Sequence, residues 1–198
     1  MGLTLPPTVT AYLAVVAAVA LLRFAELFIS ARHRRALAAA GAKAVYEPHF
    51  KWMALLHTAI LAGAALEVVL LHRPFVPALA MPALVLLVVS TWTRWWVIQT
   101  LGRHWNVGVM DSTGQGVVDT GPYRWVRHPN YTAVFVELLA LPLIHSAWIT
   151  AVLGTVAHLF VLRARVDAED RVLLANPDYV ARMGPKPSFV PTRLTRPS

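Results

Sequence analysis

The stretch GPYRWVRHPNYTAVFVELLALPLIHSAWITAVLGTVAHLFVLRARVDAED, residues 121–170, decides the fold of this chain. It contains two apolar runs, at about 131–144 and 148–162, on either side of the turn His145-Ser146. Each run is shorter than the roughly 20 apolar residues that a lone membrane-spanning helix needs. Together they predict a tight helical hairpin that crosses most of the bilayer, with polar residues at its open end.

Three further apolar runs precede this hairpin, at about 8–29, 52–71 and 75–101. Of the 198 residues, 57% are hydrophobic and 14% are charged, whereas about 25% of a soluble domain is charged. The chain is therefore predicted to be an all-α integral membrane protein. It would have about five transmembrane helices, a C-terminal helical hairpin, and a cytoplasmic loop and tail. Residues 1–101 would form three spans, and residues 102–198 the loop, hairpin and tail.

The basic residues predict the orientation of these helices. The net charge is +8, and the arginines gather at the ends of apolar runs. With five crossings, most of them fall on one side: the cluster at 32–35, Arg103, Arg124, Arg127, Arg163 and Arg165. By the positive-inside rule that side is cytoplasmic. We expect a multi-pass protein of the cell membrane whose N-terminus is outside, with lipid headgroups rather than nucleic acid as the partner of its charge.

Residue types that the chain lacks exclude several kinds of chemistry. There is no cysteine, which excludes disulfides, thiolate nucleophiles and cysteine-bound zinc. The eight histidines show no H-E-x-x-H spacing, so no metal site is predicted. The first apolar run is followed, not preceded, by basic residues, and it is expected to be a helix rather than a removable signal peptide.

Two polar clusters flank the predicted hairpin. The first, at residues 121–131, contains two arginines, His128 and two tyrosines, and could bind an anionic or zwitterionic ligand. The second, at 163–170, places Arg165 and Glu169 four residues apart on one helix face. A basic loop anchored to headgroups and a solvated helix end are the plainer alternatives. Because the hairpin would bring both clusters to one membrane face, an enzyme is favoured.

Charged residues inside the apolar runs have two possible roles. Arg23 and Glu26 share a helix face and can form a structural ion pair. Glu137 is either a functional carboxylate or the partner of an arginine or histidine of the loop. His57 and Glu67 leave the same two possibilities open.

The two clusters resemble a known family. Gly121-Pro122-Tyr123-Arg124, followed by Arg127-His128-Pro129-Asn130-Tyr131, resembles the G-x-Y…R-H-P-x-Y signature of the isoprenylcysteine carboxyl methyltransferase family. The segment Arg165 to Asp170 is similar to its closing R-x-x-x-E-E pattern. The resemblance covers about residues 90–190. The N-terminal half looks like a bacterial branch, some of whose members are similar to enzymes that methylate alkylpyrones or phenolic lipids.

This resemblance implies S-adenosylmethionine bound at the cytoplasmic face between loop and tail. The implied cofactor contacts are Gln115, Gly116, Val117, Val118, Tyr123, His128, Pro129, Asn130, Tyr131 and Glu169. Arg165 matches the arginine that faces the substrate. Gln115 stands where related enzymes often carry histidine, and Asp170 replaces the second glutamate.

The predicted function is methyl transfer from S-adenosylmethionine to a carboxylate or hydroxyl of a lipophilic acceptor, which would enter from the bilayer. A carboxylate needs no general base, whereas a phenol or enol would be helped by His128 or Glu137. An NADPH-dependent membrane reductase of the steroid-reductase type is one alternative. A non-enzymatic small membrane protein, such as a transporter or assembly subunit, is another.

Overall fold

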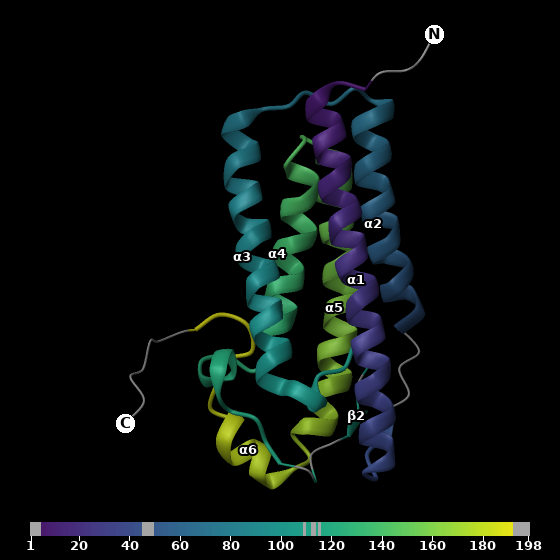
Figure 1. Cartoon of the computed structure of the whole chain (residues 1–198). Helices are drawn as coiled ribbons and strands as arrows, with labels where there is room; N and C mark the ends of the chain where they lie inside the picture. The colour runs from purple at the N-terminus through teal and green to yellow at the C-terminus, as the bar shows by residue number, and fades with distance from the viewer. Residues whose placement is uncertain (1–4, 45–49, 109, 112–113, 115, 192–198) are drawn as a thin grey trace.

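The structure is a computed structural model that describes residues 5–44, 50–108, 110–111, 114 and 116–191. Within these ranges, five long helices run side by side (Figure 1): α1 (Pro7–Ala39), α2 (Phe50–Leu70), α3 (Pro77–Leu101), α4 (Pro129–Leu143) and α5 (Trp148–Leu173). A short helix, α6 (Pro177–Met183), lies across one end of the bundle. Short 3-10 turns follow α3 (η1, Gly102–His104) and precede α4 (η3, Gly121–Arg124). Two-residue strands, β1 (Lys43–Ala44) and β2 (Met110–Asp111), pair antiparallel.

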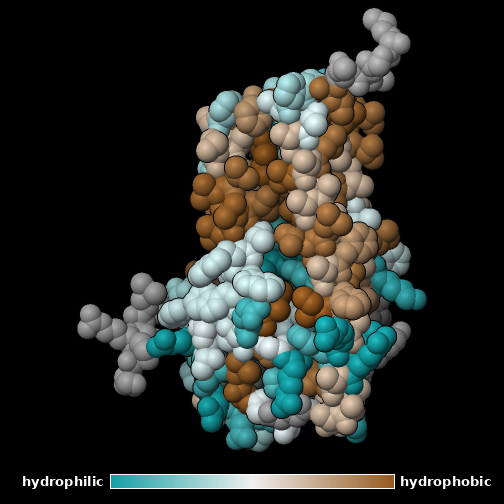
Figure 2. Space-filling view, viewed as in Figure 1, coloured by the Kyte–Doolittle hydropathy of each residue, from teal (hydrophilic) through white to brown (hydrophobic). Residues whose placement is uncertain are grey.

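Successive long helices run in opposite directions, so their connections lie at two opposite ends of the bundle. These two ends differ in composition. The C-terminal ends of α1, α3 and α5 meet α6 and the described parts of the loop between α3 and α4, residues 102–108 and 116–128, and we call this the polar end (Figure 1). The opposite end carries the α2–α3 and α4–α5 turns. Figure 2 shows a hydrophobic surface over the bundle away from the polar end and mainly hydrophilic residues around it.

Among the residues that the structure describes, four helices are long and apolar enough to cross a membrane: α1, α2, α3 with its 3-10 extension, and α5. Their outward faces carry large exposed side chains such as Phe24, Leu70, Val88 and Phe160. The prediction of an all-helical membrane protein is confirmed at this level. Helix α4 has 15 residues and rises only about 22 Å, less than the roughly 30 Å hydrocarbon core. A fifth crossing therefore stays a prediction.

Helices α1 and α5 both extend beyond the apolar runs that predict them. Helix α1 continues through the basic cluster to Ala39, and the chain turns at Gly41, which has a φ of 89°. Helix α5 continues ten residues past Arg163 to Leu173. The alternative of a solvated helix end at residues 163–170 does not hold for Arg165, which is 5% exposed. It lies on the face of α5 that packs inside the bundle.

Helix α5 is held against α2 at two levels. A Cβ on Gly154 would lie 2.8 Å from Cγ1 of Ile60, so only glycine allows the helices to approach this closely. Nearer the α4–α5 turn, the Glu67 carboxylate accepts hydrogen bonds from the backbone N–H groups of Ile149 (3.0 Å) and Thr150 (2.7 Å). Glu67 thus caps α5, and it also pairs with Arg73 at 2.8 Å. These contacts favour the structural role for Glu67.

Candidate active site

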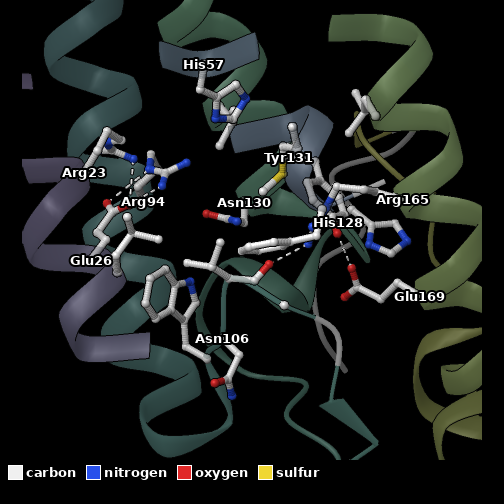
Figure 3. Close-up of a pocket in the computed structure, with 18 of the residues that line it drawn as sticks. Arg23, Glu26, His57, Arg94, Asn106, His128, Asn130, Tyr131, Arg165 and Glu169 are labelled. Carbon is white, nitrogen blue, oxygen red and sulfur yellow. Dashed lines mark hydrogen bonds and ion pairs between the residues drawn. The ribbon is translucent and has the colours of Figure 1, made fainter. Parts of the chain in front are cut away.

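A cavity of about 540 Å³ opens between the helices and reaches the polar end. All five long helices, the loop after α3 and Tyr179 of α6 contribute to its wall. Its volume lies in the range of small-molecule sites. Figure 3 shows how its polar side chains converge from separate elements.

The two predicted clusters meet in this cavity. The Tyr131 hydroxyl on α4 donates a hydrogen bond to Oε2 of Glu169 on α5 (Figure 3). The Arg165 guanidinium lies over the Tyr131 ring, 5.7 Å from its centroid. Arg165 also donates to the backbone carbonyl of Val107 at 2.7 Å. Arg165 and Glu169 both line the cavity, as their four-residue spacing on α5 allows.

His128 and Asp170 make a second link between the clusters. His128 Nε2 donates to Oδ1 of Asp170 at 3.0 Å, and Arg127 lies 3.3 Å from the same carboxylate. His128 is 3% exposed and its ring packs against Tyr131 and Phe189. The position of His128 at the cavity wall is therefore fixed by the tail of the chain.

The segment after α6 runs back along the loop and holds it. The backbone N–H groups of Arg127 and His128 donate to the carbonyls of Pro187 (2.9 Å) and Ser188 (2.8 Å). The Lys186 ammonium donates to the Tyr123 carbonyl at 2.7 Å. Burial lowers the pKa of Lys186. The pKa of Tyr123 is raised, mainly because the side chain is buried and also because the Glu169 carboxylate is nearby. Tyr123 thus enters the cavity wall as a neutral phenol.

Helix α1 positions the loop from the other side. The Ser30 hydroxyl accepts a hydrogen bond from the Val107 backbone N–H at 2.9 Å, and His33 Nδ1 donates to the Trp105 carbonyl at 2.9 Å. Val107 is also the residue that accepts from Arg165. The part of α1 beyond the predicted span therefore helps to place Arg165.

Two asparagines that line the cavity have side-chain oxygens without a hydrogen-bond donor from the described part of the protein. The side-chain oxygens of Asn106 and Asn130 are buried and accept no hydrogen bond among the described residues. A buried polar atom without a partner is costly, so such atoms indicate ligand or water contacts. Asn130 was predicted from the sequence. Asn106 was not, and only its place in a long polar loop could have suggested it.

A buried ion cluster lies on the α1 side of the cavity. Arg23 lies 2.7 Å from Glu26, and Arg94 of α3 also pairs with Glu26. Glu137 of α4 lies 3.5 Å from Arg23 and 3.8 Å from Arg94. The predicted Arg23–Glu26 pair is confirmed and is half of a larger cluster. Glu137 does not line the cavity, and its partners are arginines of helices rather than of the loop.

The cavity brings together most of the residues implied by the family resemblance. Those that line it are Gly116, Val117, Val118, Tyr123, His128, Asn130, Tyr131, Arg165 and Glu169. Pro129 is not part of the wall and begins α4, where its missing N–H costs nothing. Gln115 lies outside the described residues. Among the described residues, no group of three or more His, Asp or Glu could hold a metal ion.

Fold and site together define a multi-helix membrane protein with a ligand cavity that joins a polar mouth to an apolar interior. Residues 83–175 match the isoprenylcysteine carboxyl methyltransferase (ICMT) family. The chain is 30% identical over 152 residues to the uncharacterized protein YpbQ of Bacillus subtilis, covering 76% of this chain and 89% of that protein. It is 28% identical over 153 residues to an uncharacterized protein of Haemophilus influenzae, covering 77% and 88%. The chain belongs to the isoprenylcysteine carboxyl methyltransferase family, which indicates a multi-pass membrane methyltransferase.

Proposed function

We propose that this protein transfers a methyl group from S-adenosylmethionine to a carboxylate or hydroxyl oxygen of a lipophilic acceptor. The observation that carries the proposal is the meeting of Tyr131 and Glu169, from α4 and α5, in a cavity that continues into an apolar region. A charged donor and a lipophilic acceptor need a site of this kind, because the polar part of the cavity suits the donor and the apolar part suits the acceptor.

The residues at the polar end fit the donor. S-adenosylmethionine, when bound, supplies a methyl group on a sulfonium, and it carries an ammonium and a carboxylate as well. The Glu169 carboxylate suits the ammonium, and the oxygens of Asn106 and Asn130 suit N–H or hydroxyl donors. The faces of Tyr123 and Tyr131 favour a cation.

The apolar part of the cavity fits a lipid tail. Beyond His57 it is lined on α2 by Leu61, Ala62 and Ala65, and on α1 by Val16 and Ala20. From His57 to Ala65 the α2 wall rises about 12 Å. A tail entering sideways from the bilayer would place its reactive head group near Arg165.

Arg165 is the residue we assign to the acceptor oxygen. It is buried and fixed by the Val107 carbonyl and the Tyr131 ring. A guanidinium held in this way can donate to a carboxylate or an alkoxide without rearranging. His128, bound to Asp170, orients the wall beside it. Catalysis would rest on holding donor and acceptor in line.

We further propose that α4 and α5 form the fourth and fifth membrane crossings. The polar end would then face the cytoplasm, where basic residues gather. The short connection between the helices, residues 144–147, and their mutual packing support this arrangement.

Ligand binding by the full chain in detergent tests the function. We expect calorimetric binding of S-adenosylhomocysteine, the product form of the donor, and none of NADP⁺. Radiolabelled methyl groups should pass to an alkyl-tailed acceptor. Binding of NADP⁺ alone would support a reductase, and binding of neither ligand would contradict enzymatic function of either kind.

A further inference from the structure

The cavity wall carries two histidines with ring nitrogens that make no hydrogen bond in the described part of the protein. His57 of α2 and His158 of α5 both line the cavity, and their ring centroids are 5.3 Å apart. The nitrogens concerned are His57 Nε2 and both ring nitrogens of His158, and all three are buried. His158 is 3% exposed, and Figure 3 shows the His57 ring pointing into the cavity. Because buried imidazole nitrogens usually have partners, the pair indicates contact with a polar group of a ligand.

The histidine pair lies between the polar end and the apolar part of the cavity. Of the cavity-lining residues on α5, Glu169 is nearest the polar end, and Arg165 and then His158 lie further in. The step from Arg165 to His158 is about 10 Å along the helix axis. An acceptor whose reacting oxygen lies at Arg165 would therefore pass the pair partway along its tail. The rest of the tail would lie beside Leu61 and Ala65 of α2.

The surroundings of the pair favour an uncharged ligand group. A cation would be repelled by the arginines that lie near His57, which are Arg23 of α1, Arg94 of α3 and Arg165 of α5. An anion would find little attraction, because the first two of these arginines are already paired with glutamates of the buried ion cluster. On α4, the ring of Phe135 packs against His158 and carries no charge.

Two uncharged imidazoles offer both kinds of hydrogen bond. Repulsion between rings this close, and from the nearby arginines, favours the uncharged form of both histidines. An uncharged imidazole has one N–H that donates and one ring nitrogen that accepts. A ligand group that both donates and accepts, such as a hydroxyl or a secondary amide, can satisfy the pair. A methylene group at the same place would leave the buried nitrogens without a partner, which is costly.

We propose that His57 and His158 recognise an uncharged polar group, a hydroxyl or a secondary amide, that the acceptor carries partway along its tail. This group is distinct from the oxygen that receives the methyl group, and the two histidines determine specificity without taking part in proton transfer. The inference rests on the proposed function, which places the reacting oxygen at Arg165. An extended chain advances about 1.2 Å per bond, so the polar group stands about eight bonds from the head group of the acceptor.

Two positional isomers of one fatty acid test the place of this polar group. In 9-hydroxydodecanoate the hydroxyl lies about eight bonds from the carboxylate, whereas in 3-hydroxydodecanoate it lies close to the carboxylate. The isomers contain the same atoms, so partition into the membrane affects both alike. Calorimetry with the full chain in lipid nanodiscs, saturated with S-adenosylhomocysteine, should give a Kd about tenfold lower for the 9-hydroxy isomer. Equal Kd values for the two isomers would overturn the proposal.

Substitution of the pair tests whether these side chains recognise the hydroxyl. His57→Phe combined with His158→Phe removes the ring nitrogens and keeps aromatic rings at both positions. The double variant should bind the two isomers with the same Kd. Without a ligand, its thermal midpoint should equal or exceed that of the wild type, because buried polar atoms without partners are removed. A retained preference for the 9-hydroxy isomer would refute the role of the histidines.

Two controls separate this result from other failures. His145→Phe removes another buried imidazole, which lies at the α4–α5 turn outside the cavity wall, and should leave the isomer preference at its wild-type value. S-adenosylhomocysteine should bind the double variant as tightly as the wild type. Absence of that binding in the wild type would refute the methyltransferase function. Normal donor binding without an isomer preference, or without binding of either fatty acid, would refute the present inference alone.

Discussion

Glu169→Gln is the substitution that most directly probes the donor end of the cavity. The amide keeps the size of the side chain and can still accept a hydrogen bond from the Tyr131 hydroxyl. It loses the negative charge that we assign to the donor ammonium. The variant therefore removes one interaction without removing the contact that joins α4 to α5.

The expected loss follows from the type of bond removed. A hydrogen bond to a charged group contributes about 1.5–3 kcal/mol, and about 1.4 kcal/mol corresponds to a tenfold change in affinity. The Kd for S-adenosylhomocysteine should rise about 10-fold to 100-fold. Isothermal calorimetry in detergent measures this change, and the thermal midpoint without ligand shows whether the bundle is intact.

Asp167→Asn is the matched control, because Asp167 lies on the same helix, is exposed and does not line the cavity. It removes the same charge and should change the Kd less than twofold. Tyr131→Phe removes only the ring hydroxyl and should raise the Kd less than Glu169→Gln does. If Glu169→Gln binds S-adenosylhomocysteine as tightly as the wild type does, Glu169 does not contact the donor and the assignment of the polar end to the donor is wrong.

Three other predictions concern the acceptor, the helix cap and the orientation. Arg165→Ala should reduce methyl transfer at saturating donor more than it weakens S-adenosylhomocysteine binding; equal losses would contradict its acceptor role. Glu67→Gln removes the charged cap of α5, worth about 1 kcal/mol, so the thermal midpoint should fall by about 2–4 °C while donor affinity stays constant. Because the chain has no cysteine, His72→Cys and Asp178→Cys can each report one side. An impermeant maleimide should label only His72→Cys in intact cells, and the reverse pattern would invert the proposed topology.

Local patterns in the sequence were enough to predict the helices and the meeting of the two clusters. Apolar runs report burial in lipid directly, and a short turn between two such runs leaves an antiparallel pair as the simplest arrangement. Tyr131 and Glu169 are 38 residues apart, yet the hairpin places them at the same end. Their contact could therefore be inferred without knowing how α1, α2 or α3 pack.

Contacts between helices that do not follow one another in the sequence could not be predicted. The sequence showed the Arg23–Glu26 pair because it is local, but not that Arg94 and Glu137 complete it. His158 is a lone histidine in an apolar run, and nothing local links it to His57. Their proximity requires α2 and α5 to touch, which depends on Gly154 meeting Ile60.

The register of α5 explains why so much of the site depends on one helix. Residues 158, 162, 165 and 169 recur at intervals of three or four, so they fall on a single face. Along that face, a residue's number corresponds to its distance from the polar end. Glu169, which we assign to the donor, lies nearest that end, Arg165, which we assign to the reacting oxygen, lies further in, and His158 lies beyond it. The hydropathy pattern indicates that an apolar run ends near Arg163. The helix continues to Leu173, and Arg165 on its inner face is still buried. The chemistry of the cavity would then depend on which charged residues lie on the inner face of α5. The position at which the apolar run ends does not reveal which residues those are.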